Sequence, residues 1–226
     1  MKQTIWKALF LLVLILDLIA VYFKYEAIEF ISKPLLMPLL TVYLLLQTRS
    51  SQSNLKPWII LALFFSWSGD MFLMFEEKRS VFFLLGLSAF TLAQLSYIIF
   101  FHGIRMREYI RGNALLLLPV VVYYCILISI LSPFLHEMKL PVQIYAVILS
   151  FMWMLAMHTL LGKNKKAGAW MMSGATLFVA SDSLLAFNKF YLTFDYAGVI
   201  IMLTYGLAQL FIVHGAVQYL RSESTD

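Results

Sequence analysis

Residues 6–23 read WKALFLLVLILDLIAVYF, an apolar run broken only by Lys7 near its start and Asp17 near its end. A helix that crosses the hydrocarbon core of a bilayer, about 30 Å thick, needs about 20 mostly apolar residues. The beginning of the chain also resembles a secretory signal peptide, but it has no small-x-small cleavage site and many similar runs follow it. We therefore interpret this run as the first helix of an integral membrane protein.

The composition favours the same class of protein. Hydrophobic residues make up 62% of the chain and charged residues 13%, whereas soluble domains average about 45–50% and about 25%. The net charge is +5, but the basic residues are scattered among short polar gaps, so they read as topology signals and not as a nucleic-acid surface. The single cysteine, Cys125, lies in an apolar run, which argues against a disulfide framework and a thiolate metal site.

Seven further apolar runs follow the first, and only short polar gaps separate them. The predicted spans are 6–23, 35–47, 57–75, 81–101, 114–131, 141–161, 169–187 and 196–219. The second is short, but it can extend through Pro34 or meet a locally thin bilayer. No gap has room for a soluble domain, so we predict one all-α, polytopic transmembrane domain over residues 1–226 with about eight transmembrane helices.

The basic residues are divided unevenly between the two predicted sides. Eleven Lys and Arg residues lie on the side that holds both chain ends, and six lie on the other side. Short cytoplasmic loops carry an excess of Lys and Arg. The chain therefore predicts both termini in the cytoplasm, in the plasma (inner) membrane if the source is a bacterium.

The chain also contains a faint internal repeat. GDMFLMF (69–75) resembles SDSLLAF (181–187), with an acid followed by Leu three residues later and Phe five residues later. LAQLSYIIFFHG (92–103) resembles LAQLFIVHG (207–215). Two tandem four-helix units would give a parallel repeat, and Asp70 and Asp182 would then hold equivalent positions.

Asp70 and Asp182 are the leading candidates for chemistry. Each lies about five residues before its predicted helix ends, near Glu76 and Asn188, which at 1.5 Å per residue is roughly 8 Å below the outer boundary. Asp17 falls at a similar depth and is a possible third acid. An ionised carboxylate facing lipid costs on the order of 3 kcal/mol or more, so these side chains should face the interior of the bundle.

Small residues flank both aspartates, in WSGDM (67–71) and ASDSL (180–184), and small residues let helices approach closely. The two carboxyls are therefore expected to meet across one seam. In such a buried pair one acid keeps its proton while the other is ionised, as acid–base hydrolysis requires. The alternative is that each aspartate is only a hydrogen-bond partner between helices, and for Asp17 this structural role is favoured slightly.

One pair of glutamines recurs at matched positions of the repeat, and each glutamine has a tyrosine nearby. Gln94 and Gln209 occupy the same place in it, and Tyr97 and Tyr205 lie three or four residues away on the same helical faces. They are candidates for binding substrate or orienting a water, about two turns deeper than the aspartates. Hydrogen bonding between helices explains them equally well.

Three polar residues are candidates for binding a substrate's head group at the outer edge: Lys33, Asn188 and Lys189. For the lysines, extension of the side chain to the membrane surface is the commoner explanation. The four histidines are scattered, and no two share a helix at the spacing of metal ligands. The sequence therefore predicts neither a metal site nor a cofactor.

The chain resembles the YhhN-like family, the lysoplasmalogenases. The resemblance spans nearly the whole chain and rests on the order and spacing of FSWSGDMFL (65–73), GLSAFTLAQLSY (86–97), FVASDSLLAFNKF (178–190) and YGLAQLFIV (205–213), with Lys33-Pro34 at the second helix. It implies hydrolysis of the vinyl-ether bond of a lysoplasmalogen to a fatty aldehyde and a glycerophospho-ethanolamine or -choline. It also implies that the acidic positions are Asp70 and Asp182. Many relatives carry His where this chain has Gln94, which cannot titrate.

These residues leave two other functions open. A small proton-coupled transporter would also place acids inside the membrane in paired repeats. An intramembrane aspartyl protease uses two membrane aspartates as well, but Ser68-Gly69 before Asp70 lacks the preceding Gly usual in such proteases. The expected partners are a lysophospholipid substrate and membrane lipid, with no nucleic acid, and the oligomeric state is not indicated.

Overall fold

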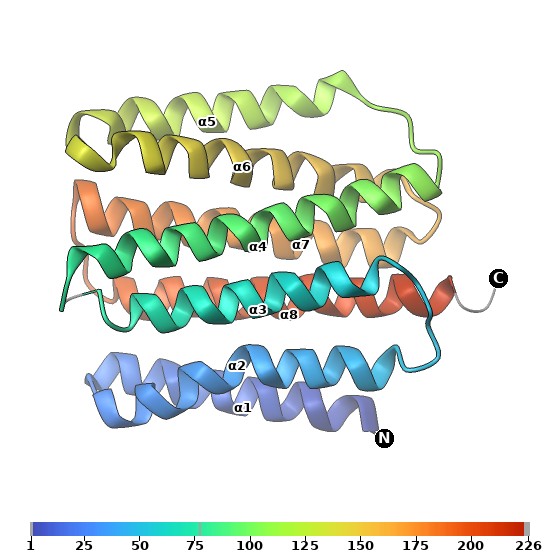
Figure 1. Ribbon diagram of the computed structural model, residues 1–226, viewed down its shortest axis with the longest axis horizontal. Coiled ribbons are helices and arrows are strands. Elements are labelled where there is room, and N and C mark those ends of the chain that lie inside the picture. Colours follow the sequence, from blue (N-terminus) through green and yellow to red (C-terminus); the bar gives the residue numbers. More distant parts are fainter. Residues whose placement is uncertain (1, 77, 224–226) are drawn as a thin grey trace.

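The computed structural model describes residues 2–76 and 78–223. Within these ranges the chain forms eight long helices and no strand, and the helices lie side by side in one bundle (Figure 1). They are α1 (Lys2–Phe23), α2 (Glu26–Gln47), α3 (Lys56–Leu73), α4 (Ser80–Arg107), α5 (Leu117–Leu131), α6 (Lys139–His158), α7 (Lys165–Ala186) and α8 (Ala197–Ser222).

Short helical turns extend several of the long helices. Four are 3-10 turns: η1 (Ala114–Leu116), η2 (Ser132–Phe134), η3 (His136–Met138) and η4 (Thr159–Leu161). The fifth, η5 (Phe187–Tyr191), is a π-helical turn that continues α7 directly. Such turns are rare and often occur at functional sites.

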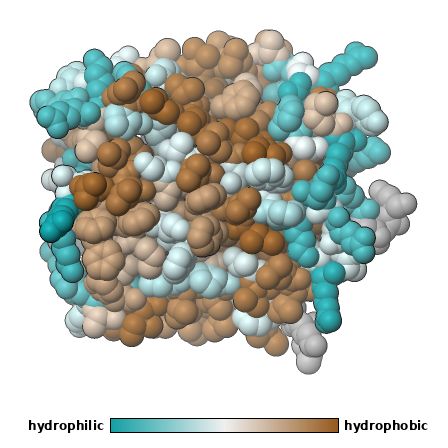
Figure 2. Space-filling view, viewed as in Figure 1, coloured by the Kyte–Doolittle hydropathy of each residue, from teal (hydrophilic) through white to brown (hydrophobic). Residues whose placement is uncertain are grey.

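The surface of the bundle matches a membrane protein. All the long helices except α3 are long and apolar enough to cross a bilayer. Figure 2 shows apolar side chains over the middle of the visible face and hydrophilic ones gathered at its two ends. The predicted all-α, polytopic membrane fold is confirmed. Helix α3 is 18 residues long and polar around Asp70, and its role as an eighth span rests on its place in the bundle beside α4 (Figure 1).

Helix α2 is longer than the apolar run that predicted it. It begins at Glu26 instead of residue 35 and spans 22 residues, with Pro34 and Pro38 inside it. The added turns are polar but helical, because acids favour the first turn of a helix and Glu29 forms an i,i+4 ion pair with Lys33. The second helix is therefore long enough to span, and no thinning of the bilayer is required.

Helix α3 packs along α4, and α7 packs along α8. Glycine allows the closest approach in the second pair. A Cβ atom added at Gly174 of α7 would lie 2.7 Å from the backbone oxygen of Ala208, and one at Gly215 of α8 would lie 2.7 Å from that of Ala167. Small residues at such contacts let helices associate inside a bilayer, where no hydrophobic effect drives them together.

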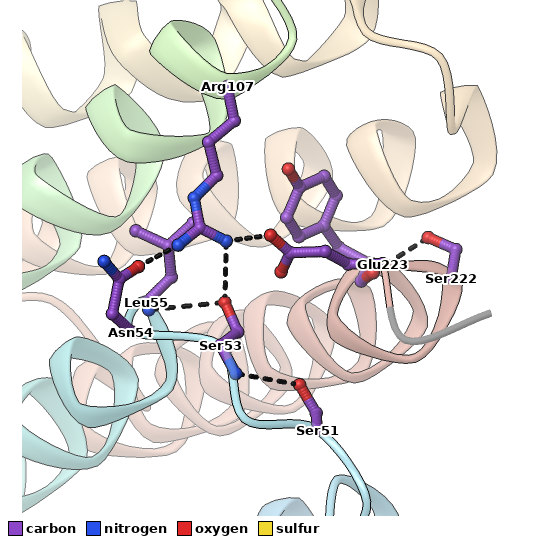
Figure 3. A network of polar contacts seen from close by, with 8 residues as sticks. Ser51, Ser53, Asn54, Leu55, Arg107, Ser222 and Glu223 are labelled. Carbon is purple, nitrogen blue, oxygen red and sulfur yellow. Dashed lines mark hydrogen bonds and ion pairs between the residues drawn. The ribbon is translucent and has the colours of Figure 1, made fainter. Parts of the chain in front are cut away.

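A polar network ties together the end of the bundle where α1 begins and α8 ends (Figure 3). Arg107, at the end of α4, donates to Ser53 Oγ at 2.8 Å and also bonds Asn54 and Glu223. One guanidinium thus joins the α2–α3 connection to the end of α8. We call this end of the bundle the terminal end and the other the opposite end.

Candidate active site

A polar cavity of about 210 Å³ lies between the helices. It has room for several waters or a small polar group, since one water occupies about 30 Å³ in the liquid. Its walls come from α1, α2, α3, α4, α7, η5, α8 and the residues that follow α3. The lining residues are Val21, Glu29, Lys33, Asp70, Leu73, Glu76, Phe90, Ser181, Asp182, Leu185, Asn188, Gly198, Ile201, Met202 and Tyr205.

Asp70 lines this cavity from α3. Its residue is 3% exposed, and its Oδ2 accepts a hydrogen bond of 2.9 Å from the Tyr205 hydroxyl of α8. The neighbouring Gly69 leaves room for the ring of Phe90, which would lie 2.7 Å from an added Cβ. The small residue before the acid therefore brings α4 against this part of α3 and encloses the carboxyl.

Asp182 lines the same cavity from α7. Its Oδ2 accepts a hydrogen bond from the Tyr145 hydroxyl of α6. On either side, Ser181 donates to the Ile201 backbone oxygen of α8 at 3.0 Å, and Ser183 bonds the Tyr123 hydroxyl of α5 at 2.8 Å. The two aspartates thus line one cavity from different helices, and each carboxyl accepts a hydrogen bond from a tyrosine. The expected meeting of the two carboxyls across one packed seam stays a prediction.

A second, smaller cavity of about 40 Å³ adjoins the polar one and is almost wholly apolar. The two share Leu73, Phe90, Asp182 and Leu185. Its other walls come from α4, α6, α7 and η5, namely Phe83, Leu87, Val142, Tyr145, Ala186 and Phe190. Asp182 therefore stands where a polar space meets a small apolar one.

Asp17 is fully buried on α1, close to this site but not on the cavity wall. Its Oδ1 accepts a hydrogen bond of 2.7 Å from Ser32 Oγ of α2. Its Oδ2 has no hydrogen-bond donor among the described residues, although the carboxyl interacts electrostatically with Lys33 and Asp70. The three acids of the predicted layer thus lie near one another, and the Ser32 bond is consistent with a structural role for Asp17.

The predicted glutamine and tyrosine positions divide into two groups. Tyr205 lines the cavity. Gln94, Tyr97 and Gln209 are fully buried and lie outside its lining. Gln209 accepts a hydrogen bond from the Tyr97 hydroxyl and donates to Ser66 Oγ at 2.9 Å, so it links α8 to α3 and α4. These contacts match the alternative of hydrogen bonding between helices, and a role in substrate binding stays a prediction.

Gln94 differs from Gln209 in its contacts. Neither its side-chain oxygen nor its nitrogen has a hydrogen-bond partner of good geometry among the described residues. Its amide does interact electrostatically with the Tyr145 hydroxyl, which bonds Asp182. A buried amide without full hydrogen bonding is costly, which makes Gln94 a candidate for holding a water or part of a substrate.

The predicted head-group residues lie around the polar cavity. Lys33 is inside α2, its Nζ is 3.0 Å from Glu29 Oε1, and its side chain lines the cavity. Asn188, in η5, lines the cavity too. Lys189 is not part of the lining. Its Nζ, however, is 3.3 Å from Oε1 of Glu76, and Glu76 does line the cavity.

Sequence reasoning did not single out Tyr145, Glu29 or Glu76 as members of the site. Tyr145 is one tyrosine in the apolar run 141–161 and belongs to no motif, so no local signal marks it. Glu29 lies outside the predicted second span, and Glu76 marks only the predicted end of the third helix. Within residues 2–76 and 78–223, no group of three or more His, Cys, Asp or Glu side chains is arranged to hold a metal ion.

Comparison with known proteins gives one family. The sequence model of the YhhN family matches residues 28–216. Lysoplasmalogenase TMEM86A of Bos taurus is 29% identical over 166 residues, which are 71% of this chain and 65% of that protein. Lysoplasmalogenase TMEM86B of Rattus norvegicus is 33% identical over 153 residues, 66% of this chain and 57% of that protein. The chain thus spans under two thirds of the length of these relatives, and no solved structure matches it.

Proposed function

This chain belongs to the YhhN family, and from that premise we propose that it is a membrane hydrolase that cleaves the vinyl-ether bond of lysoplasmalogens. Two proteins that it resembles are named lysoplasmalogenases. The observation that carries the proposal is the polar cavity lined by both Asp70 and Asp182, with an apolar cavity beside Asp182. The products would be a fatty aldehyde and a glycerophospho-base.

The reaction needs one acid and one carboxylate. Protonation of the vinyl-ether carbon farther from the oxygen gives an oxocarbenium ion, and water attacks the carbon bonded to oxygen. The hemiacetal formed in this way breaks its other C–O bond, which releases the aldehyde and the free glycerol hydroxyl. The carboxylate stabilises the cation and takes the proton of the water, much as paired carboxylates act at glycosidic bonds. No metal, nucleotide or thiol takes part.

The surroundings of the two aspartates suggest their roles. Each carboxyl accepts a hydrogen bond from a tyrosine, Asp70 from Tyr205 and Asp182 from Tyr145, so these bonds do not distinguish the two acids. Asp70 also interacts electrostatically with the Lys33 ammonium, which favours its ionised form relative to that of Asp182. Asp182 stands at the apolar boundary, where the ether between head and tail of the substrate would lie. We assign Asp182 as the proton donor and Asp70 as the carboxylate.

The proposal includes the placement of the protein in the membrane. In this proposal one transmembrane domain holds the site, and both termini lie in the cytoplasm, which the excess of Lys and Arg at the terminal end favours. The polar cavity then lies near the outer face, since Glu76 and Asn188 follow helices that run away from the terminal end. In a bacterium this would be the inner membrane. A reporter protein that works only in the cytoplasm should therefore be active when it is fused after α8.

The function is tested by aldehyde release from a purified lysoplasmalogen by the protein in detergent. Asp70→Asn and Asp182→Asn should each abolish release, because neither amide can donate or accept the required proton. Asp195→Asn is the matched control, since Asp195 is exposed in the connection before α8 and lies outside the cavity lining. Full activity in both cavity variants refutes the two-acid mechanism. Uptake of a solute by proteoliposomes, with no chemical product, would support the transporter instead.

A further inference from the structure

The polar cavity carries fixed charges of both signs besides the two aspartates. Lys33 and Glu29 face it from α2, and Glu76 faces it from the segment after α3. Each glutamate is paired with a lysine, Glu29 with Lys33 at 3.0 Å and Glu76 with Lys189 at 3.3 Å. The acid–base mechanism uses Lys33 only through its interaction with Asp70 and uses neither glutamate.

Lys33 is the one cation among the lining residues of this cavity. Its ammonium is in contact with Glu29 and interacts electrostatically with Asp70 and Asp17. The side chain is 14% exposed, so this charge is largely withdrawn from water. Among the described residues that line the cavity, Lys33 is therefore the cationic partner that an entering anionic group would find.

Glu76 offers the complementary partner. Its Oε1 pairs with Lys189, whereas its Oε2 is buried and has no hydrogen-bond donor among the described residues. A buried carboxylate oxygen without a donor is costly, and a ligand that donates an N–H to it would remove that cost. The position of Glu76 on the cavity wall makes such a ligand possible.

We propose that this cavity selects a zwitterionic phosphoethanolamine head group, with the phosphate on Lys33 and the primary ammonium on Glu76. The inference rests on the proposed function and names the head group that the same site prefers. A primary ammonium donates N–H bonds to carboxylates, which a quaternary ammonium cannot do. Quaternary ammonium groups are recognised by cages of several aromatic rings. Among the described residues that line this cavity, two are aromatic, Phe90 and Tyr205.

The substrate would enter by exchanging partners with ion pairs that already exist. Its phosphate takes the place of Glu29 at Lys33, and its ammonium binds Glu76 beside Lys189. The exchange releases Glu29 from Lys33, but the Glu29 side chain is 28% exposed and can be solvated, whereas the ammonium supplies a donor to the buried oxygen of Glu76. A purely anionic head group would face Glu29 and Glu76 without a compensating cation, and a substrate with no head group would gain neither contact.

The test measures kcat/KM for three substrates with the same alkenyl chain: the ethanolamine lysoplasmalogen, the choline lysoplasmalogen and 1-alkenylglycerol, which has no head group. Glu76→Gln should lower kcat/KM for the ethanolamine substrate about tenfold or more, as expected for one charge-assisted hydrogen bond, and change that for 1-alkenylglycerol less than about threefold. Glu137→Gln is the matched control, because Glu137 is exposed in η3 and lies outside the cavity lining. It should change neither value.

A binding measurement separates this proposal from the proposed function. Phosphoethanolamine should raise the thermal unfolding temperature of the wild type more than phosphocholine does, and Glu76→Gln should remove that difference. If binding behaves in this way but no substrate is cleaved, the head-group site stands and the hydrolase proposal fails. If all substrates are cleaved but Glu76→Gln lowers all three equally, or none, the head-group proposal is overturned. Equal stabilisation by both phospho-bases also overturns it.

Discussion

Replacing Tyr205 by Phe removes one hydroxyl group from the candidate active site and little else. That hydroxyl donates to Asp70 Oδ2 at 2.9 Å. The phenylalanine ring would keep the edge-to-face contacts that Tyr205 makes with Phe90 and Phe178, at centroid distances of 5.9 and 5.6 Å. The change therefore removes one buried hydrogen bond to the carboxylate that we assign to the reaction, together with the weaker interaction of the same hydroxyl with Gln209.

The size of the effect follows from the kind of bond. A hydrogen bond to a neutral group contributes about 1 kcal/mol and one to a charged group about 1.5–3 kcal/mol. Because about 1.4 kcal/mol corresponds to a factor of ten, Tyr205→Phe should lower kcat/KM between about tenfold and about a hundredfold if Asp70 is ionised. Aldehyde release can be followed continuously through NADH formed by an added aldehyde dehydrogenase.

Tyr97→Phe is the comparison. The Tyr97 hydroxyl is equally buried, but it bonds Gln209 and lies outside the cavity lining. This variant should lose a similar amount of stability in thermal unfolding and less than about threefold in kcat/KM. Wild-type activity in Tyr205→Phe, or equal losses of activity in both variants, would refute the assignment of Tyr205 as a positioning residue for Asp70.

Three further results are expected. Phe190→Ala removes one wall of the apolar cavity and the contacts that this ring would make with the alkenyl chain. It should raise KM severalfold for long alkenyl chains and leave the preference among head groups unchanged, as kinetics with substrates of different chain length and head group would measure. Gly174→Val should destabilise the bundle by about 1–3 kcal/mol or more in thermal unfolding, because its Cβ would lie 2.7 Å from the Ala208 backbone oxygen, whereas Ala at the exposed Gly112 should have little effect. Dialysis against EDTA should leave aldehyde release unchanged, because a carboxylic acid supplies the proton, and a loss restored by added metal would contradict the mechanism.

The apolar runs predicted the helices well because the bilayer imposes a minimum length and apolarity on each span. They failed at the start of α2, where Glu26, Glu29 and Lys33 continue the helix beyond the apolar run. Residues near the membrane surface are not required to be apolar, so hydropathy alone does not mark where such a helix begins. Capping and i,i+4 pairing decide it instead.

The sequence alone determined the class of this protein and the burial of its acids. The cost of placing a carboxylate in lipid requires that Asp17, Asp70 and Asp182 face inward in any helical bundle that this chain forms. The tertiary structure decided which groups meet them. Tyr145 and Tyr205 reach the two cavity aspartates from helices distant in sequence, and local patterns carry no information about such contacts. The cavity with its mixed charges exists only where several helices leave space between them, so packing alone fixed its size and its lining.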